Sequence, residues 1–322
     1  MKTRVTEILG IKYPIMQGGM QWLTGAEFAA SVCNAGALGT INASVFDKVE
    51  DLRLEIRKLK NMTDRPFAVN ISMLPETTEN ELTDDYFQAV FEEKVKIIET
   101  AGRNPEKYIP DIKKHGVKLI HKVPAVRFAR KAQEIGADIV TIVGYECAGH
   151  PGMDDVASSV LIQKATGVLD IPVMVGGGIV DGRGLVAALA WGAEGVVMGT
   201  RFIATKECPI NTKFKEWIIQ AKETDTILIQ RSIKNTLRVM KNKAALKVLE
   251  MEKKGATLEE LMPFISGKVG KKALAEGNLE RANFAIGQGI GLIREIKTVQ
   301  EVIEDTIKGA EETLLRLNTI VG

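Results

Sequence analysis

The feature that most constrains the fold is a repeated unit: a helix-length segment, a glycine turn and then a short apolar run. Gly36, Gly116, Gly136 and Gly192 each lie just before such a run. Glycine readily adopts the left-handed conformation that ends a helix, so this spacing is typical of βα repeats. The runs are rich in Val and Ile and hydrophobic at nearly every position, which indicates strands buried on both faces, as in a parallel sheet.

Eight such runs occur in the first two thirds of the chain. The predicted strands are 13–17, 38–41, 67–72, 95–100, 119–123, 139–143, 172–176 and 195–198. Eight βα units match a (β/α)8 TIM barrel. The alternative, a doubly wound open sheet, would carry a glycine-rich dinucleotide fingerprint after its first strand. The turn QGGMQWLTG at that place does not fit the fingerprint, so the barrel is favoured.

The pattern changes after Thr205. Residues 211–300 show helical periodicity with many Lys and Glu and no predicted strand, and Gly255, Gly267 and Gly277 divide them into short helices. In the last segment, Ile303, Ile307, Ala310, Leu314 and Leu317 are spaced to form one apolar helix face. These patterns predict a barrel made of residues 1–210 plus 301–322, with residues 211–300 as an added helical substrate or cap domain.

Composition argues against several classes of partner. The 43 Lys and Arg nearly balance the 41 Asp and Glu, and no basic run suggests a nucleic-acid partner. The first residues lack a signal-peptide pattern, and the most apolar stretches are too short to span a bilayer, so we expect a cytoplasmic protein without membrane insertion. The three cysteines and three histidines show no metal-ligand spacing, and neither a metal nor a disulfide is expected.

Glycines follow the two last strands of the predicted barrel, where barrels frequently bind phosphate. The seventh strand runs into VGGGIVDGRG and the eighth into MGTRF. Consecutive glycines leave backbone N–H groups open to close approach by an anion. A tight turn is the plainer interpretation of either motif, but their joint occurrence predicts a phosphate site. Its residues are Gly177, Gly178, Gly199 and Thr200.

Other strand ends carry residues suited to a flat redox ring. Gly18 and Gly19, followed by Met20, leave little side-chain bulk after the first strand, and Asn70 offers an amide at the third. Lys122 lies near the end of the fifth strand. A fixed ammonium there would stabilise the negative charge that a flavin gains on reduction.

The sixth strand leads into GYECAGHPG, where His150 sits between Gly149 and Pro151. A lone histidine is more often structural than catalytic, but its place after a barrel strand favours a role in proton handling. Glu146 is interpreted as orienting the loop. Cys147 is interpreted as a packed small side chain, because no second group pairs with it in the sequence.

Together the motifs YPIMQGGM, NISMLP, IIETAG, HGVKLIHK, GYECAGHPG, GGGIVDGRG, MGTRFIATKECPI and LIQRSIKNTLRV resemble the nitronate monooxygenase (2-nitropropane dioxygenase) family over nearly the whole chain. They are most similar to its branch of FMN-dependent NADH:quinone reductases. The resemblance implies an FMN-containing barrel with a helical substrate domain. It implies cofactor contacts at Gly18, Gly19, Asn70, Lys122, Gly149, Gly177, Gly178, Gly199 and Thr200, and Met20, Glu146 and Gly176 complete the predicted cofactor set from the same motifs. It also places Pro75 at nicotinamide access and matches His150 to the family histidine proposed as a base.

Three activities remain open at this point. The leading hypothesis is reduction of FMN by NADH or NADPH, followed by electron transfer to a small quinone-like acceptor. The first alternative is oxidation of alkyl nitronates with O2. This loop has Cys147-Ala148 before Gly149, where nitronate oxidisers usually have two glycines before the histidine, so the base role of His150 is left open. The further alternative is FMN-dependent reduction of an enoyl thioester. A flavin-free barrel that binds another phosphorylated ligand is a different class, and a homodimer is one alternative for the oligomeric state.

Overall fold

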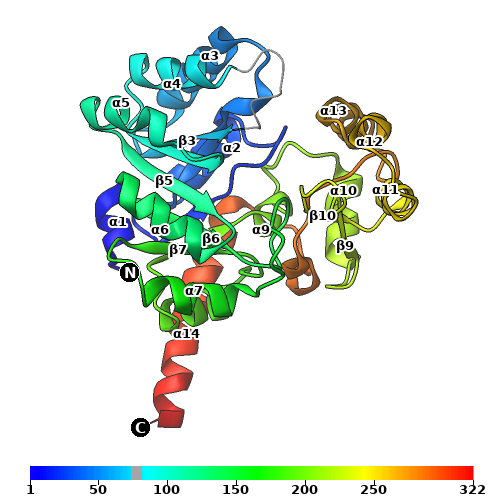
Figure 1. Cartoon of the computed structure of the whole chain (residues 1–322). Coiled ribbons are helices and arrows are strands. Elements are labelled where there is room, and N and C mark those ends of the chain that lie inside the picture. The colour runs from blue at the N-terminus through cyan, green and yellow to red at the C-terminus, as the bar shows by residue number, and fades with distance from the viewer. Residues whose placement is uncertain (74–81, 322) are drawn as a thin grey trace.

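The computed structural model describes residues 1–73 and 82–321 and contains the predicted parallel barrel (Figure 1). Eight strands pair in parallel in the order β1-β8-β7-β6-β5-β4-β3-β2. They are β1 (Ile15–Gln17), β2 (Gly39–Asn42), β3 (Phe67–Met73), β4 (Ile97–Gly102), β5 (Lys118–Val123), β6 (Ile139–Val143), β7 (Val173–Gly176) and β8 (Gly195–Met198). All eight strand predictions are confirmed, because runs buried on both faces are a strong sequence signal.

The barrel closes between β1 and β2, where the regular ladder gives way to a single bridge from Met16 to Leu38. Beyond this bridge, side chains replace backbone pairing. The Gln17 Oε1 atom accepts from the Thr40 backbone N–H at 3.1 Å, and the Thr40 hydroxyl donates to the Gln17 carbonyl at 2.9 Å. The two short strands therefore stay joined at the end where the barrel opens toward the site.

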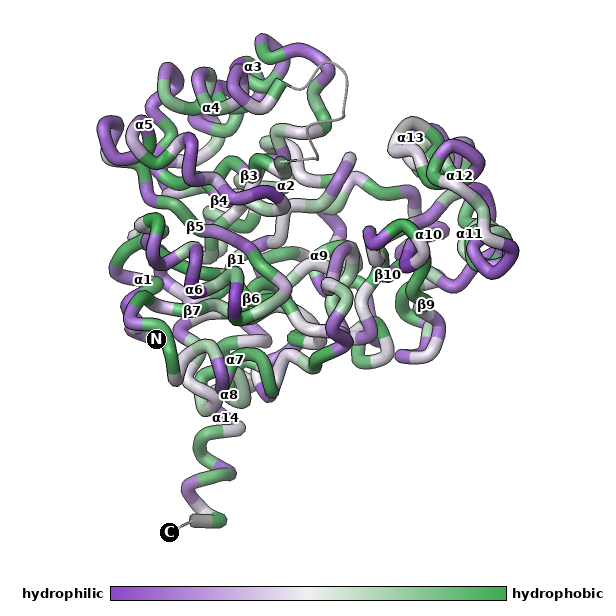
Figure 2. The backbone as a smooth tube through the Cα atoms, in the orientation of Figure 1, coloured by the Kyte–Doolittle hydropathy of each residue, from purple (hydrophilic) through white to green (hydrophobic). Residues whose placement is uncertain are grey.

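Helices alternate with the strands, and most of them cover the outside of the barrel. They are α2 (Ala26–Asn34), α3 (Val49–Met62), α4 (Thr83–Glu92), α5 (Ile109–Lys114), α6 (Val126–Ile135), α7 (Ser158–Thr166), α8 (Gly182–Ala190) and α9 (Thr200–Ile203), with short 3-10 turns η1 (Ala43–Val45) and η2 (Glu106–Tyr108). Hydrophilic and hydrophobic positions alternate along α3 and α5, as expected of helices with one face on the core (Figure 2). None of the described helices is long and apolar enough to cross a membrane.

The interior of the barrel changes character along its axis. At the amino-terminal end of the strands, Leu38 just before β2 and one apolar residue from each of the other seven strands pack with Val5 and Leu9 of α1 (Arg4–Leu9) and with Ile11. Two residues further along their strands, the inward positions become polar: Asn70, Glu99, Lys122 and Thr141. Because side chains alternate along a strand, these residues form a polar layer under the barrel mouth.

The segment between α9 and the last helix lies to one side of the barrel mouth (Figure 1). It contains α10 (Thr212–Gln220), β9 (Thr226–Ile229), β10 (Leu237–Met240), α11 (Lys243–Lys253), α12 (Leu258–Ile265), α13 (Gly267–Glu276) and η3 (Gln288–Leu292). The expectation that residues 211–300 hold no strand is wrong, because β9 and β10 form an antiparallel pair. The expected helix breaks are confirmed. Gly255 lies between α11 and α12, Gly267 begins α13 shortly after the end of α12, and Gly277 caps the end of α13. We call this segment the cap.

The final helix, α14 (Val299–Val321), returns to the barrel and packs on α8. A Cβ atom on Gly182 would collide with backbone of α14 at Ala310, so only glycine allows this close approach. Ile303, Ile307 and Ala310 are buried as predicted, whereas Leu314 is 45% exposed. The predicted apolar face is therefore buried only in the first half of α14, and the helix then extends away from the barrel (Figure 1).

Candidate active site

A cavity of about 980 Å³ lies between the carboxyl ends of the barrel strands and the cap. Its walls include residues that follow most of the barrel strands, together with side chains from the cap. Of the predicted site residues, those lining it are Gly18, Gly19, Met20, Lys122, Gly149, His150, Gly176, Gly177, Gly178, Gly199 and Thr200. The structure thus brings together, in one cavity, predicted residues that are far apart in the sequence.

The glycines after β7 form part of the cavity wall that a side chain would disrupt. Gly177 has φ of +110°, and a Cβ atom there would lie 2.7 Å from the Ser158 Oγ atom. Gly178 has φ of +73° and a freer surrounding. Both conformations favour glycine, and the bare backbone leaves room for a bulky anionic group. This cradle fits a phosphate.

The Thr200 side chain marks the neighbouring edge of the cradle. Its hydroxyl accepts a hydrogen bond from the Gly287 N–H at 3.0 Å, and the next residue, Gln288, donates its N–H to the Glu146 carbonyl at 2.9 Å. The segment from the end of the cap therefore crosses between the loops after β6 and β8. Sequence reasoning missed this segment, because AIGQGIG carries no signal beyond its glycines.

A buried ionic network lies beneath the mouth of the barrel. The Glu99 carboxylate is fully buried and lies 3.2 Å from the Lys122 ammonium through either oxygen. The Asn70 amide donates to the same carboxylate at 2.5 Å, and Ser72 donates its hydroxyl to the Asn70 side-chain oxygen. Asn70 does not line the cavity; it lies directly behind Gly19, where a Cβ atom would come within 2.8 Å of the Asn70 amide carbon.

Glu99 was not predicted, and it explains how a lysine can be held inside a barrel. A buried ammonium is costly unless a nearby anion and hydrogen bonds compensate it. Glu99 supplies that anion, so Lys122 can present positive charge to the cavity from a fixed position. The available signal was an acidic residue within the apolar run IIETA, two residues beyond the inward-facing Ile97.

The loop between β6 and α7 is held by its own side chains. The Glu146 carboxylate points away from the cavity and accepts from the Ser158 N–H at 3.0 Å and from the Ser158 hydroxyl at 2.9 Å, at the start of α7. Glu146 is therefore placed as an anchor of the loop rather than as a lining residue. Burial raises the pKa of Cys147 to about 12, so its thiol is uncharged and unsuited to nucleophilic attack.

His150 projects from this loop toward the cavity. The residue is exposed and lines the cavity. Desolvation by the surrounding protein, and secondly the positive charge of Lys122, lower the pKa of His150. The imidazole is consequently neutral at pH 7, with one nitrogen able to donate and the other able to accept a hydrogen bond.

Strand β10 of the cap pairs with the same loop. The backbones of Gly149 and Arg238 exchange two hydrogen bonds, of 3.2 and 2.7 Å, as in an antiparallel pair. The Arg238 guanidinium is almost completely buried, donates to the Tyr145 carbonyl at 3.0 Å and lies 4.5 Å from the centre of the Tyr145 ring. Its second partner is the Thr226 hydroxyl of β9, at 2.9 Å. This arrangement fixes the position of the residue immediately before His150.

Much of the cavity wall that the cap contributes is apolar. Phe214 and Phe284 meet edge to face there, with ring centres 4.5 Å apart. The apolar side chains on this side, which we call the apolar lobe, are Ile203, Ile210, Phe214, Trp217, Ile218, Met240, Phe264, Ile265, Leu274, Phe284 and Ile286. Periodicity predicted helices here but could not show which of their faces would line a cavity.

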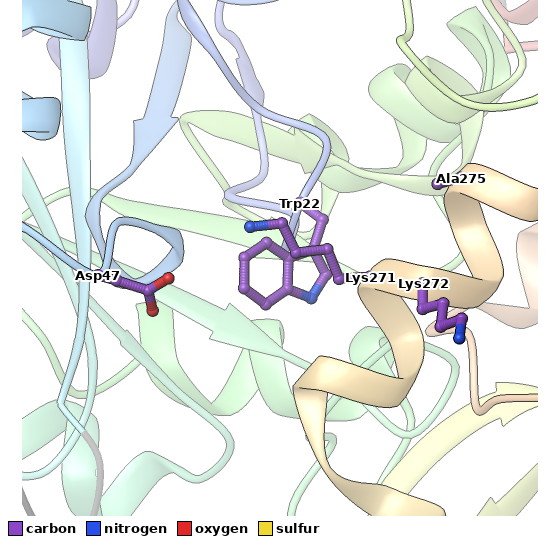
Figure 3. A pocket seen from close by; sticks show the side chains of 5 residues that line it. All are labelled: Trp22, Asp47, Lys271, Lys272 and Ala275. Atoms are coloured by element: carbon purple, nitrogen blue, oxygen red, sulfur yellow. The ribbon is translucent and has the colours of Figure 1, made fainter.

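A second, smaller cavity of about 430 Å³ lies beside the loop after β1 (Figure 3). Trp22 separates it from the large cavity and lines both. The Lys271 ammonium of α13 lies 4.7 Å from the centre of the Trp22 indole, and Asp47 lines the same cavity. Trp22 adopts φ of +65°, which is uncommon for a bulky residue. This contact joins the cap to the barrel loop.

Two remaining predictions concern Pro75 and metal binding. Pro75 falls outside the described residues, so its predicted role at nicotinamide access stays a prediction. Among residues 1–73 and 82–321, no three His, Cys, Asp or Glu side chains gather in a way that could hold a metal ion.

Known proteins resemble this chain over its whole length. A probable nitronate monooxygenase of Staphylococcus saprophyticus is 31% identical, with 98% of this chain and 99% of that protein covered. A 5-hydroxy-7a-methyl-1-oxo-octahydro-1H-indene-4-carboxyl-CoA dehydrogenase of Rhodococcus jostii is 29% identical, with 96% of each chain covered. The solved structure of FabK from Thermotoga maritima is 39% identical, with both chains fully covered and a TM-score of 0.92.

The sequence profile of one family matches residues 2–309 and therefore includes every element that builds the cavity. The resemblance noted in the motifs is thereby confirmed. The chain belongs to the nitronate monooxygenase family of oxidoreductases.

Proposed function

We propose that the protein is an FMN-dependent oxidoreductase that uses NADH or NADPH to reduce the double bond of an enoyl thioester. When bound, FMN would supply hydride transfer from the nicotinamide to the β-carbon of the double bond, and the α-carbon would gain a proton. The observation that carries the proposal is the extended apolar lobe beside the glycine cradle, in one continuous cavity. A small nitronate would leave that lobe unused.

The residues around the cradle suit FMN. Gly177, Gly178, Gly199 and Thr200 would hold its phosphate, because their backbone leaves the space and the N–H groups that a phosphate needs. Gly18 and Gly19 would allow the flat ring to approach the barrel mouth. Lys122, held by Glu99, supplies positive charge near the cavity floor.

His150 and the apolar lobe would bind different parts of the acceptor. Because the imidazole is neutral, one ring nitrogen can donate a hydrogen bond to a thioester carbonyl oxygen. The apolar lobe would bind the acyl chain and exclude water from it, which is worth about 0.8 kcal/mol per buried methylene. The Rhodococcus jostii relative is named for action on a carboxyl-CoA, which is itself a thioester, and this supports the substrate class.

A quinone-like acceptor is the second candidate. The motif Glu146-Cys147-Ala148-Gly149-His150 resembles the branch of NADH:quinone reductases, and a flat apolar quinone could occupy the same lobe. Both candidates share the reduction of bound FMN by NADH or NADPH and differ only in the acceptor.

Anaerobic stopped-flow mixing tests the proposal in two steps. NADH or NADPH should bleach the flavin absorbance, and the reduced protein should then be reoxidised by decenoyl-CoA faster than by crotonyl-CoA at equal concentration. Leu274→Gln, which places an amide in the apolar lobe, should slow the long-chain reaction and leave the crotonyl reaction nearly unchanged. The crotonyl substrate is thus the internal control of the variant.

Three results would count against the proposal. Reoxidation by a benzoquinone but by neither thioester would select the second candidate. Flavin reduction by propyl-2-nitronate, with none by NADH or NADPH, would select nitronate oxidation. Purified protein that takes up no FMN would remove the flavin chemistry altogether.

A further inference from the structure

A second group of residues lines the large cavity where it opens past the ends of β4 and β5. Phe128 and Lys131 lie three residues apart on α6 and so share one helix face, Arg103 directly follows β4, and Lys234 lies in the turn between β9 and β10. We call these four residues the basic rim. It contrasts with the apolar lobe, because three of its members carry positive charge.

Two charges of the basic rim, those of Lys131 and Lys234, are available to an anion. Lys131 pairs with Glu106 at 3.1 Å, but both side chains are about half exposed, and such surface pairs contribute little stability. Within the described residues, Lys234 has no carboxylate partner. A phosphate could therefore engage Lys131 and Lys234 without breaking a buried ion pair.

The acidic residues next to the rim are already paired. Asp154 lies 2.7 Å from the Arg127 guanidinium, and Asp155 lies 2.8 Å from that of Arg231. These two pairs tie the end of the His150 loop to α6 and to the cap. Both aspartates are thereby paired with arginines rather than with Lys131 or Lys234.

Phe128 adds a flat apolar surface at the same place. Its side chain is 47% exposed, although it borders a cavity, and the Arg127 guanidinium lies 4.7 Å from its ring centre. An exposed aromatic ring beside basic side chains is the combination that holds a nucleobase together with its phosphates. The apolar lobe has aromatic rings but no such cations.

We propose that the basic rim binds the adenosine diphosphate part of a substrate, with the adenine on Phe128 and the phosphates near Lys131 and Lys234. This rests on the proposed function, because both NAD(P)H and coenzyme A carry that part. Lys122, six residues before Phe128, borders the same cavity near its floor. A nucleotide held at the rim would therefore extend its reactive end inward, toward Lys122 and His150.

Direct binding of ADP tests the site without turnover. In isothermal titration with the FMN-loaded protein, ADP should bind, and the double variant Lys131→Ala/Lys234→Ala should weaken it about tenfold, as expected for the loss of two charged contacts to phosphate. Phe128→Ala should weaken it separately. Lys308→Ala, an exposed lysine of α14, is the matched control and should leave ADP binding unchanged.

Kinetics with truncated substrates identify the source of the ADP part. If NAD(P)H supplies it, the double variant should raise KM for NADH about tenfold and leave KM for reduced nicotinamide mononucleotide unchanged. If coenzyme A supplies it, KM should rise for crotonyl-CoA and not for crotonyl-pantetheine. Either pattern, with kcat retained, supports the site.

The proposal is overturned if ADP does not bind, or if the double variant binds ADP and both full-length substrates as the parent does. Failure of the proposed function looks different. In that case neither NADH nor reduced nicotinamide mononucleotide would reduce the flavin, while ADP titration would still report on the basic rim.

Discussion

The two glycines after β7 allow a matched pair of substitutions that separates packing from backbone strain. Gly177→Ala and Gly178→Ala each place a methyl group at a positive φ, of +110° and +73°. At Gly177 the new Cβ atom would lie 2.7 Å from the Ser158 Oγ atom, whereas at Gly178 the nearest atom is 3.8 Å away. Only the first substitution therefore forces a neighbour to move.

The size of the difference follows from what Ser158 does. Ser158 is buried, and its hydroxyl donates to Glu146, so a shift would disturb the anchor of the loop that carries His150. A left-handed alanine costs about 1 kcal/mol, and forcing atoms into a packed site costs a further ~2 kcal/mol. We expect Gly178→Ala to lower the free energy of unfolding by about 1 kcal/mol and Gly177→Ala by about 3 kcal/mol.

Urea unfolding of the FMN-free proteins measures both values without interference from the ligand. The midpoint should fall for both variants and fall further for Gly177→Ala, with the slope against urea unchanged. Equal losses for the two variants, or a greater loss for Gly178→Ala, would refute the assignment of the close contact to Ser158. Both variants should also weaken FMN binding, since both add bulk to the cradle.

Three further predictions follow from buried ionisable groups. Glu99→Gln removes the negative partner of Lys122, so the midpoint potential of bound FMN should rise by about 30 mV. Equilibration with a reference dye measures this potential, and an unchanged value would contradict the prediction. The pKa of His121 is lowered to about 4, mainly by burial and secondly by the charge of Lys122. A hydrogen bond with Thr100 raises this pKa but does not outweigh those two effects. Stability from a neutral His121 is thus complete above pH 6.5 and falls by about 3 kcal/mol as the pH drops to 4, a dependence that His121→Gln should flatten in urea unfolding. Burial also raises the pKa of Cys147 to about 12, so iodoacetamide at pH 8 should label this thiol only after the protein is unfolded. Mass spectrometry measures the labelling, and a labelled Cys147 in the folded protein would contradict the prediction.

The barrel could be predicted from the sequence because its strands are buried on both faces and recur with the same glycine turns. β9 and β10 could not, because each is short and flanked by charged residues in a segment of helical periodicity. They are stabilised by each other, by α11 and by the pairing of Arg238 with Gly149, which are contacts between distant parts of the chain.

The glycine positions of the site were predictable because a strand end in a barrel has a known place in space. Side-chain partnerships were not. The ionic contact between Glu99 and Lys122 depends on the register of β4 against β5, and the turning of Glu146 toward Ser158 depends on where α7 begins. Sequence spacing names the residues near a site, but three-dimensional packing decides which of them face it.

The pairing of Gly149 with Arg238 gives the loop that bears His150 two attachments, one to the barrel and one to the cap. Any rotation of the cap would pull directly on the peptide next to His150, because the two backbones are hydrogen-bonded there. Binding of a ligand in the apolar lobe, which is built largely from cap residues, would therefore shift the position of the His150 imidazole. Under the proposed function, occupancy of the apolar lobe and placement of His150 would be mechanically linked, so a substrate that fits the lobe poorly would also meet a misplaced histidine.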